Sequence, residues 1–268
     1  MIRRLLLIAL VAPLFACGTA LVGSSPLGRT QLRLFPATEM DAMGIQAFEQ
    51  MKQELPQSRD QRVVRFVTCV ARAVTAEARG PTAPSGWEIK VFQDESANAF
   101  ALPGGKIGVY TGLLEVATDA SQLATVIGHE VAHVLAQHGN ERASTTFVTQ
   151  SGMQVIQSLS GPESAMRNQA MAVLGLGAQV GVLLPFSRAQ EREADLMGLD
   201  LMAAAGFEPR ASVALWQNMS RAGGAGPPEF LSTHPSSESR IQELHKRIPA
   251  ANALYARALE SGKRPRCN

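Results

Sequence analysis

One pentapeptide, HExxH from His129 to His133, places the strongest constraint on this chain because it sits within a segment of helical periodicity. The apolar residues that recur there at three- and four-residue steps are Leu123, Ile127, Val131, Val134 and Leu135. On such a helix the two histidines lie one turn apart on one face, where both imidazoles can bind one zinc ion. Glu130 projects beside them as a general base for hydrolysis. The alternative is a helix with two partly buried histidines and a surface glutamate.

A catalytic zinc site needs a third protein ligand and keeps one position open. The best source is Ser187–Asp195, which predicts a second helix on which Glu191 and Asp195 share one face. We expect Glu191 to bind the zinc and Asp195 to orient a ligating histidine through its other N–H. The residues expected on the solvated face of that helix are Arg188, Arg192 and Glu193. Glu193 as the third ligand is the alternative assignment.

Four ordered motifs resemble the zinc metalloendopeptidases of the HtpX, BepA and LoiP type. They are Asn98–Ile107, the GHExxH run Gly128–His133, the SRxxExEADxxG run Ser187–Gly198, and His234-Pro235 followed by Arg240 and Ile241. The resemblance extends from about Thr38 to Cys267 and is closest to the small periplasmic lipoprotein members such as LoiP. It implies a gluzincin fold: an α+β, mostly helical, zincin-like domain with a small β-sheet or hairpin beside the HExxH helix.

The resemblance also implies the roles of the metal-site residues. It puts His129, His133 and Glu191 on one zinc ion per chain and makes Glu130 the general base. This agrees with what the spacing of these residues predicts on its own.

The same resemblance implies that His234 lies near the zinc and that Arg240 lines the site. The surrounding segment Ala222–Ser237 is rich in Gly, Pro and Ser and carries no helical or strand period, as in long functional loops. A plain surface histidine is the alternative for His234. Two further histidines, His138 and His245, are expected on solvated helical surfaces.

A small sheet is predicted before the HExxH helix. Trp87–Phe92 alternates like a strand, and Phe100–Leu102 and Ile107–Tyr110 flank a turn at Pro103–Gly105. An edge strand beside the zinc would bind an extended substrate by backbone pairing, which suits cleavage of unfolded protein. The alternative is an ordinary core hairpin.

The rest of the chain is expected to be mostly helical. Helices are predicted over Met40–Leu55, Arg59–Ala78, the Glu191 segment as far as Gly206, Pro209 to about Ser220, and Ser237–Glu260. Thr145–Phe186 is rich in Met, Ala, Gly and Leu, and almost wholly apolar from Ala170 onward. Three interpretations of this segment remain open: a buried helix, a lid over the zinc cleft, or a surface that contacts lipid or a partner.

The first residues predict export. In Met1–Ala16 two arginines precede an apolar run of twelve residues, too short to span a membrane and typical of a signal segment. The run ends in a sequence that resembles a bacterial lipobox, with cleavage before Cys17 and lipid on its thiol. The next residue is glycine rather than aspartate, which implies an outer-membrane anchor on the periplasmic side. Residues 17–36 then form a tether and 37–268 the peptidase domain. Ordinary cleavage after Ala20, giving a soluble periplasmic protein, is the alternative.

The three cysteines fit this interpretation. If Cys17 is lipidated, Cys69 and Cys267 remain, and an even pair in an oxidising compartment is expected to form a disulfide. LoiP-like members show a similar pairing of an early helix with the C-terminal tail. Cys69 as a merely buried apolar residue is the alternative.

Together these features predict a zinc endopeptidase, and the resemblance supplies unfolded or misassembled cell-envelope proteins as its substrates. The alternatives are a chaperone-like protein that holds zinc with four ligands including His234, and an enzyme that His234 latches off. The net charge of +2 is nearly neutral and no basic cluster is large enough to indicate nucleic acid, so no nucleic-acid partner is expected.

Overall fold

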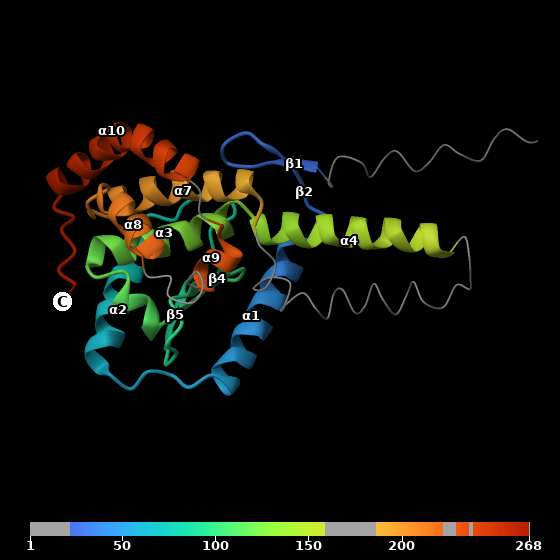
Figure 1. Ribbon diagram of the computed structural model, residues 1–268, viewed down its shortest axis with the longest axis horizontal. Helices are drawn as coiled ribbons and strands as arrows, with labels where there is room; N and C mark the ends of the chain where they lie inside the picture. Colours follow the sequence, from blue (N-terminus) through green and yellow to red (C-terminus); the bar gives the residue numbers. More distant parts are fainter. Residues whose placement is uncertain (1–21, 159–185, 222–228, 236–237, 268) are drawn as a thin grey trace, which may run out of the picture.

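The computed structural model describes residues 22–158, 186–221, 229–235 and 238–267 (Figure 1). The predicted signal segment, the lipidation site Cys17 and most of the apolar stretch up to residue 185 lie outside the described residues. Among the helices that are described, none combines the length and the apolar character needed to cross a membrane.

Two helices form the centre of the molecule. These are α3 (Ala120–Leu135), which carries the HExxH motif and is buried from Gln122 to its end, and α7 (Arg188–Ala204). Each begins with a side-chain cap: Asp119 accepts from two backbone N–H groups of α3, and Ser187 forms a capping box with Gln190. Both helices therefore exist where the sequence predicts them.

Glycines allow α3 and α7 to touch through their backbones. A Cβ atom on Gly128 would lie 2.7 Å from the carbonyl oxygen of Gly198, and one on Gly198 would lie 2.7 Å from the backbone nitrogen of His129. No larger residue fits at this crossing without moving a helix. The contact brings Glu191 of α7 within reach of the histidines of α3.

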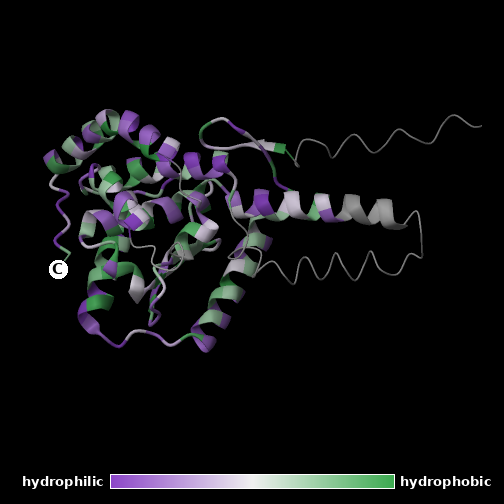
Figure 2. Cartoon of the chain, in the orientation of Figure 1, coloured by the Kyte–Doolittle hydropathy of each residue, from purple (hydrophilic) through white to green (hydrophobic). Residues whose placement is uncertain are grey.

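Other helices surround this pair and the sheet beside it. They are α1 (Ala37–Glu54), α2 (Gln61–Thr75), α4 (His138–Ser158), α8 (Ala211–Arg221) and α10 (Glu238–Glu260). In Figure 2 hydrophilic and hydrophobic residues mix along α10, as expected of a helix that packs one face on α7 and exposes the other. The predicted end of α7 is confirmed, because Gly206 follows it with φ +88°.

A three-stranded sheet lies beside α3. Its strands are β3 (Glu88–Phe92), β4 (Ala99–Leu102) and β5 (Lys106–Tyr110), in the order β3-β5-β4, and a short 3₁₀ helix, η1 (Thr111–Glu115), follows. The hairpin β4–β5 is antiparallel and turns through Gly104 and Gly105, both at positive φ, while β3 runs parallel to β5. The predicted strands and turn are confirmed, and β4 is an edge strand of this sheet. A cluster of Phe48, Phe92, Phe100 and Tyr110 packs α1 onto it.

The segment before α1 is not an open tether over its described part. Strands β1 (Val22–Ser24) and β2 (Thr30–Leu32) pair as an antiparallel hairpin. This hairpin docks on the domain: Gln31 is 1 % exposed, and Arg29 forms ion pairs with Glu141 and Glu193. The sequence shows only the Gly, Ser and Pro of a linker, because the partners that order the hairpin lie more than 100 residues away.

The predicted long loop after α8 is interrupted by a helix, α9 (Glu229–Thr233). Five residues are too few to show a helical period in the sequence, so this element was missed. Phe230 of α9 is buried and its N–H donates to the carbonyl of Ala97 before β4. The helix thereby holds the residue that follows it, His234, over the centre of the molecule.

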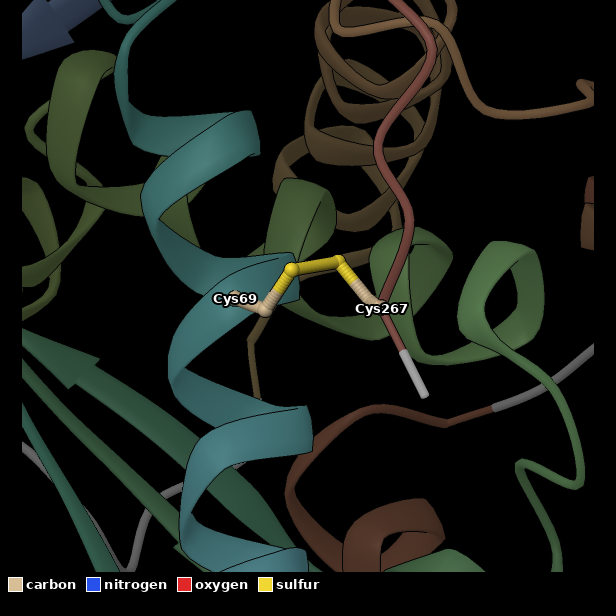
Figure 3. The surroundings of a disulfide bond; sticks show 2 residues. All are labelled: Cys69 and Cys267. Atoms are coloured by element: carbon tan, nitrogen blue, oxygen red, sulfur yellow. A yellow bond between two sulfur atoms is a disulfide. The ribbon is translucent and has the colours of Figure 1, made fainter.

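Cys69 of α2 and Cys267 form a disulfide, as predicted, across a sequence separation of 198 residues (Figure 3). The bond fixes the C-terminal tail against α2. Cys267 is itself buried, so the bridge lies at the edge of the main hydrophobic core.

Candidate metal centre

Four side chains from three parts of the chain converge between α3, α7 and the end of α9. His129 and His133 come from α3, Glu191 from the first turn of α7, and His234 from the residue after α9. One ligand atom from each lies within 4.8 Å of all the others, and all four side chains are buried. The structure thus brings together the three predicted ligands and places His234 directly among them.

The separations of these atoms fit a tetrahedral zinc. Zinc binds imidazole nitrogen and carboxylate oxygen at roughly 2.0–2.2 Å, which sets neighbouring ligand atoms about 3.3 Å apart. Nε2 of His129 lies 3.0 Å from Nε2 of His133 and 3.2 Å from Nδ1 of His234. Oxygen atoms of Glu191 lie 3.5 Å from His129 Nε2, 3.3 Å from His133 Nε2 and 2.9 Å from His234 Nδ1. Donor type, burial and spacing all suit zinc.

Asp195 lies one turn beyond Glu191, where the sequence places it. Its Oδ1 accepts from Nδ1 of His129 at 3.1 Å, which leaves Nε2 of that ring directed at the cluster. Arg240 of α10 donates to both oxygens of Asp195 at 2.6 and 2.7 Å and lies 2.6 Å from Glu191. One arginine therefore holds both the Glu191 carboxylate of the cluster and the Asp195 carboxylate that contacts His129.

Glu130 faces the cluster from α3. Its Oε1 lies 3.3 Å from Nε2 of His234, and its Oε2 accepts from the backbone N–H of Ala101 in β4 at 3.3 Å. Burial raises the pKa of Glu130, which favours proton uptake by this carboxylate. The Glu130 carboxylate is thus fixed between the edge strand and the fourth side chain of the cluster.

The charges of the cluster are strongly coupled. Burial opposes protonation of His129, but Glu191 and Asp195 outweigh it and raise the pKa of His129 to about 9. Burial lowers the pKa of His133. Burial also disfavours the charged form of Glu191, yet the facing histidines lower its pKa below the ordinary value. Metal binding needs the neutral form of His129, so the two carboxylates that raise its pKa make metal binding dependent on pH.

The expectation that His138 is a solvated surface residue is wrong. Its side chain is fully buried, its Nδ1 lies 2.9 Å from Nδ1 of His133, and its Nε2 lies 3.1 Å from Oε2 of Glu193. The polar stretch around it conceals this, because two of the groups that pack on His138, Glu193 and Phe186, lie much later in the chain. The spacing of five residues after His133 is the only signal that the sequence contained.

Glu193 is also not on a solvated face. It is 4 % exposed, binds His138 and Arg29, and is not one of the four clustered ligands. The expected solvated positions are confirmed for Arg188 and Arg192 on α7 and for His245 on α10, because all three are exposed.

Aromatic rings that the sequence analysis did not identify enclose the cluster. Phe230 stacks on His234 with ring centroids 4.4 Å apart, and Phe186 stacks on His133 at 3.9 Å. The guanidinium of Arg240 lies over the ring of Trp216 at 4.3 Å. Beside His133 a cavity of about 210 Å³ opens toward α1 and the end of β4. These apolar walls strengthen the electrostatic interactions within the site.

Comparison with known proteins agrees with this geometry. The sequence profile of "Peptidase family M48" matches residues 57–248. The mitochondrial metalloendopeptidase OMA1 of Schizosaccharomyces pombe is 39 % identical over 167 residues, covering 62 % of this chain and 48 % of that protein. The human metalloendopeptidase OMA1 is 32 % identical over 234 residues, with 84 % and 44 % covered. The beta-barrel assembly-enhancing protease of Escherichia coli O157:H7 is 25 % identical over 230 residues, with 82 % and 45 % covered. The chain thus spans about half the length of the curated relatives it matches.

Proposed function

This chain belongs to peptidase family M48, and from that premise we propose that it is a zinc-dependent endopeptidase that cleaves unfolded or misassembled cell-envelope proteins. The observation that carries the proposal is the convergence of His129, His133 and Glu191 with Glu130 beside them. Bound zinc would supply Lewis-acid chemistry, polarising the scissile carbonyl and lowering the pKa of water to about 7. Family relatives named metalloendopeptidases support the same reaction.

The residues of this chain then have separate roles in the proposed reaction. Glu130 accepts the proton of the attacking water and delivers it to the leaving amine, a contribution of about 10²–10⁴-fold in rate. Asp195 and Arg240 fix the orientation of His129 and of the ligand carboxylate. The rings of Phe230 and Phe186 keep the surroundings apolar.

The substrate is proposed to bind as an extended strand. β4 is an edge strand, and its Ala101 contacts Glu130, so a chain paired with β4 would pass the base and the ligand cluster. Backbone pairing selects for extended conformation rather than for particular side chains. An unfolded protein meets that requirement, and a folded one does not.

The envelope setting is proposed from the first residues of the sequence. The signal-like run and the lipobox-like residues before Cys17 suggest a LoiP-like lipoprotein anchored on the periplasmic side of the outer membrane. The bacterial relative named for β-barrel assembly supports an envelope substrate. Membrane fractionation of the parent chain and of Cys17→Ser tests the anchor. Loss of membrane association in the variant is expected, and equal association in both would refute it.

The reaction is tested with the full chain and its Glu130→Gln variant on casein, an unfolded protein, with the zinc content of each sample measured. We expect zinc in both proteins and cleavage only by the parent, because the substitution removes the base and leaves the ligands in place. Cleavage by both would refute the role of Glu130. Zinc in both with cleavage by neither would favour a zinc-holding, chaperone-like protein or a latched enzyme.

The position of His234 favours a second candidate, an enzyme that is latched off. Its Nδ1 contacts both His129 and Glu191, and its Nε2 faces Glu130, so the ring occupies the fourth position that a catalytic zinc keeps open. If His234 is a latch, His234→Ala has higher caseinolytic activity than the parent. If it assists catalysis, the variant has lower activity. His245→Ala, which removes an exposed histidine of α10, is the matched control.

A further inference from the structure

We infer that His138 and Glu193 are positioning residues for the zinc ligand His133, and that the N-terminal hairpin completes their network through Arg29. The inference rests on the proposed zinc function, since it concerns how one ligand of that site is held. It assigns a role to two buried polar residues that the proposed chemistry does not use.

The chain turn after α3 brings His138 back to the site. Gln137 has φ +53°, a left-handed conformation that residues with a Cβ atom adopt at a cost of roughly 1–2 kcal/mol. This turn ends α3 and starts α4 at His138, whose ring lies 4.9 Å from that of His133, centroid to centroid. The strained turn at Gln137 therefore places the ring of His138 beside the ring of His133.

Metal binding by His133 would leave one tautomer for each of the two rings. With a metal ion bound at Nε2 of His133, the proton of that ring is on Nδ1, which donates to Nδ1 of His138 at 2.9 Å. His138 then carries its own proton on Nε2 and donates it to Oε2 of Glu193 at 3.1 Å. The chain of two hydrogen bonds ends on a carboxylate, as the direct bond from His129 to Asp195 does. Each histidine of the HExxH motif is thus oriented by a carboxylate of α7.

The N-terminal hairpin holds the far end of this chain of hydrogen bonds. Oε2 of Glu193 accepts from Nε and Nη2 of Arg29 at 3.3 and 3.2 Å, and Oε1 accepts from the backbone N–H of Leu27 at 3.2 Å. Arg29 also donates to both oxygens of Glu141 in α4. The same hairpin holds the turn after α3, because Gln31 donates to the carbonyl of Ala136 at 2.8 Å. Residues 22–32 thereby fix Glu193 and the turn together.

A network of this kind is expected to act on metal binding. Partners that orient metal ligands typically change metal affinity by about 10–100-fold when removed. The side chains of His138 and Glu193 are almost fully buried, so water cannot readily take the place of either. Truncating either one leaves the Nδ1 proton of His133 without its fixed acceptor.

The test is the zinc dissociation constant of the full chain, measured by competition with a chromophoric chelator. We expect His138→Ala and Glu193→Ala to bind zinc about 10–100-fold more weakly than the parent. His138→Gln is expected to recover most of the affinity, since its amide can accept from His133 and donate to Glu193. The matched controls are His245→Ala and Arg192→Ala, which remove an exposed histidine and an exposed neighbour of Glu193.

The role of the hairpin is tested by Arg29→Ala, with the exposed Arg62→Ala as its control. We expect weaker zinc binding and a changed visible absorption spectrum of the cobalt-substituted protein for Arg29→Ala only. Thermal unfolding of each variant shows whether it is folded. A merely structural role would lower the melting temperature while the folded protein kept parental zinc affinity and cobalt spectrum.

The outcomes separate this inference from the proposed function. If the parent chain binds no zinc, the proposed function itself fails. If the parent binds zinc and His138→Ala, Glu193→Ala and Arg29→Ala bind it equally well, the proposed function stands and the positioning role is wrong. If His138→Gln binds zinc no more tightly than His138→Ala does, the hydrogen-bonding argument is also wrong.

Discussion

Glu88 illustrates, for single residues, how one carboxylate can hold three elements together. It begins β3, accepts from Nζ of Lys106 in β5 at 2.8 Å and from Nζ of Lys52 in α1 at 2.9 Å. These bonds, Lys106 first and Lys52 second, lower the pKa of Glu88 below its ordinary value of 4.5. The charged form is therefore favoured by folding.

Replacement of Glu88 by Gln is expected to lower the free energy of unfolding by about 0.5–1 kcal/mol at pH 7, because partly exposed ion pairs contribute little more. A lowered folded-state pKa stabilises the protein above the unfolded value and loses that effect as the pH falls through the folded value. The difference between parent and variant should therefore shrink between pH 4.5 and pH 3. Urea unfolding of parent and variant at pH 4.5 and at pH 3 measures this difference in the free energy of unfolding. The exposed Glu115→Gln is the control. An equal difference at both would contradict the assignment.

The sequence predicted single site residues well where they share one element. His129, Glu130 and His133 follow from helical spacing alone, and Glu191 and Asp195 follow from the same rule on a second helix. His138 and Glu193 were misjudged because their partners are distant in the sequence: Glu193 lies 55 residues after His138, and Arg29 lies 164 residues before Glu193. No local pattern contains that information.

Among the elements, the crossing of α3 and α7 determines whether the site can form. Gly128 and Gly198 face each other there, and each would place a Cβ atom 2.7 Å from the backbone of the other helix. The spacing between the helices decides how far Glu191 lies from the two histidines. Packing and metal binding are therefore coupled at this point.

Gly198→Ala is expected to destabilise the protein by about 1–3 kcal/mol and to weaken zinc binding, because the helices must separate to admit the methyl group. Gly139→Ala is the matched control, since its Cβ would meet nothing within 4 Å and alanine favours a helix. Thermal unfolding with and without zinc measures both effects. Unchanged stability and zinc affinity in Gly198→Ala would show that the helices are not held this closely.

Elements with a strong local pattern were predicted, and elements ordered by distant contacts were not. The helix of the HExxH motif and the strands around Pro103–Gly105 have clear periods and caps or turns. The hairpin β1–β2 and the short helix α9 have neither, and both are ordered by contacts with distant segments. The segment around Arg29 was accordingly predicted as a tether, and that around Phe230 as a loop.

For the whole molecule, the disulfide between Cys69 and Cys267 is the longest covalent constraint described. A loop of this length gives an upper limit of about 5 kcal/mol from chain entropy, while measured effects are typically about 2–4 kcal/mol. We expect the Cys69→Ala, Cys267→Ala double variant to unfold at lower urea concentration than the oxidised parent. Reduction of the parent should lower its midpoint by a similar amount. Identical midpoints for all three samples would contradict a stabilising role.

The spread of the site along the chain has a consequence for the order of synthesis. A growing chain contains Arg29 early, HExxH near its middle, and the α7 carboxylates, His234 and Arg240 only later. Until residue 240 has been made, Glu191 and Asp195 lack the arginine that holds them. A chain that ends before residue 240 therefore lacks the arginine contacts of this cluster, even though the HExxH helix is already present.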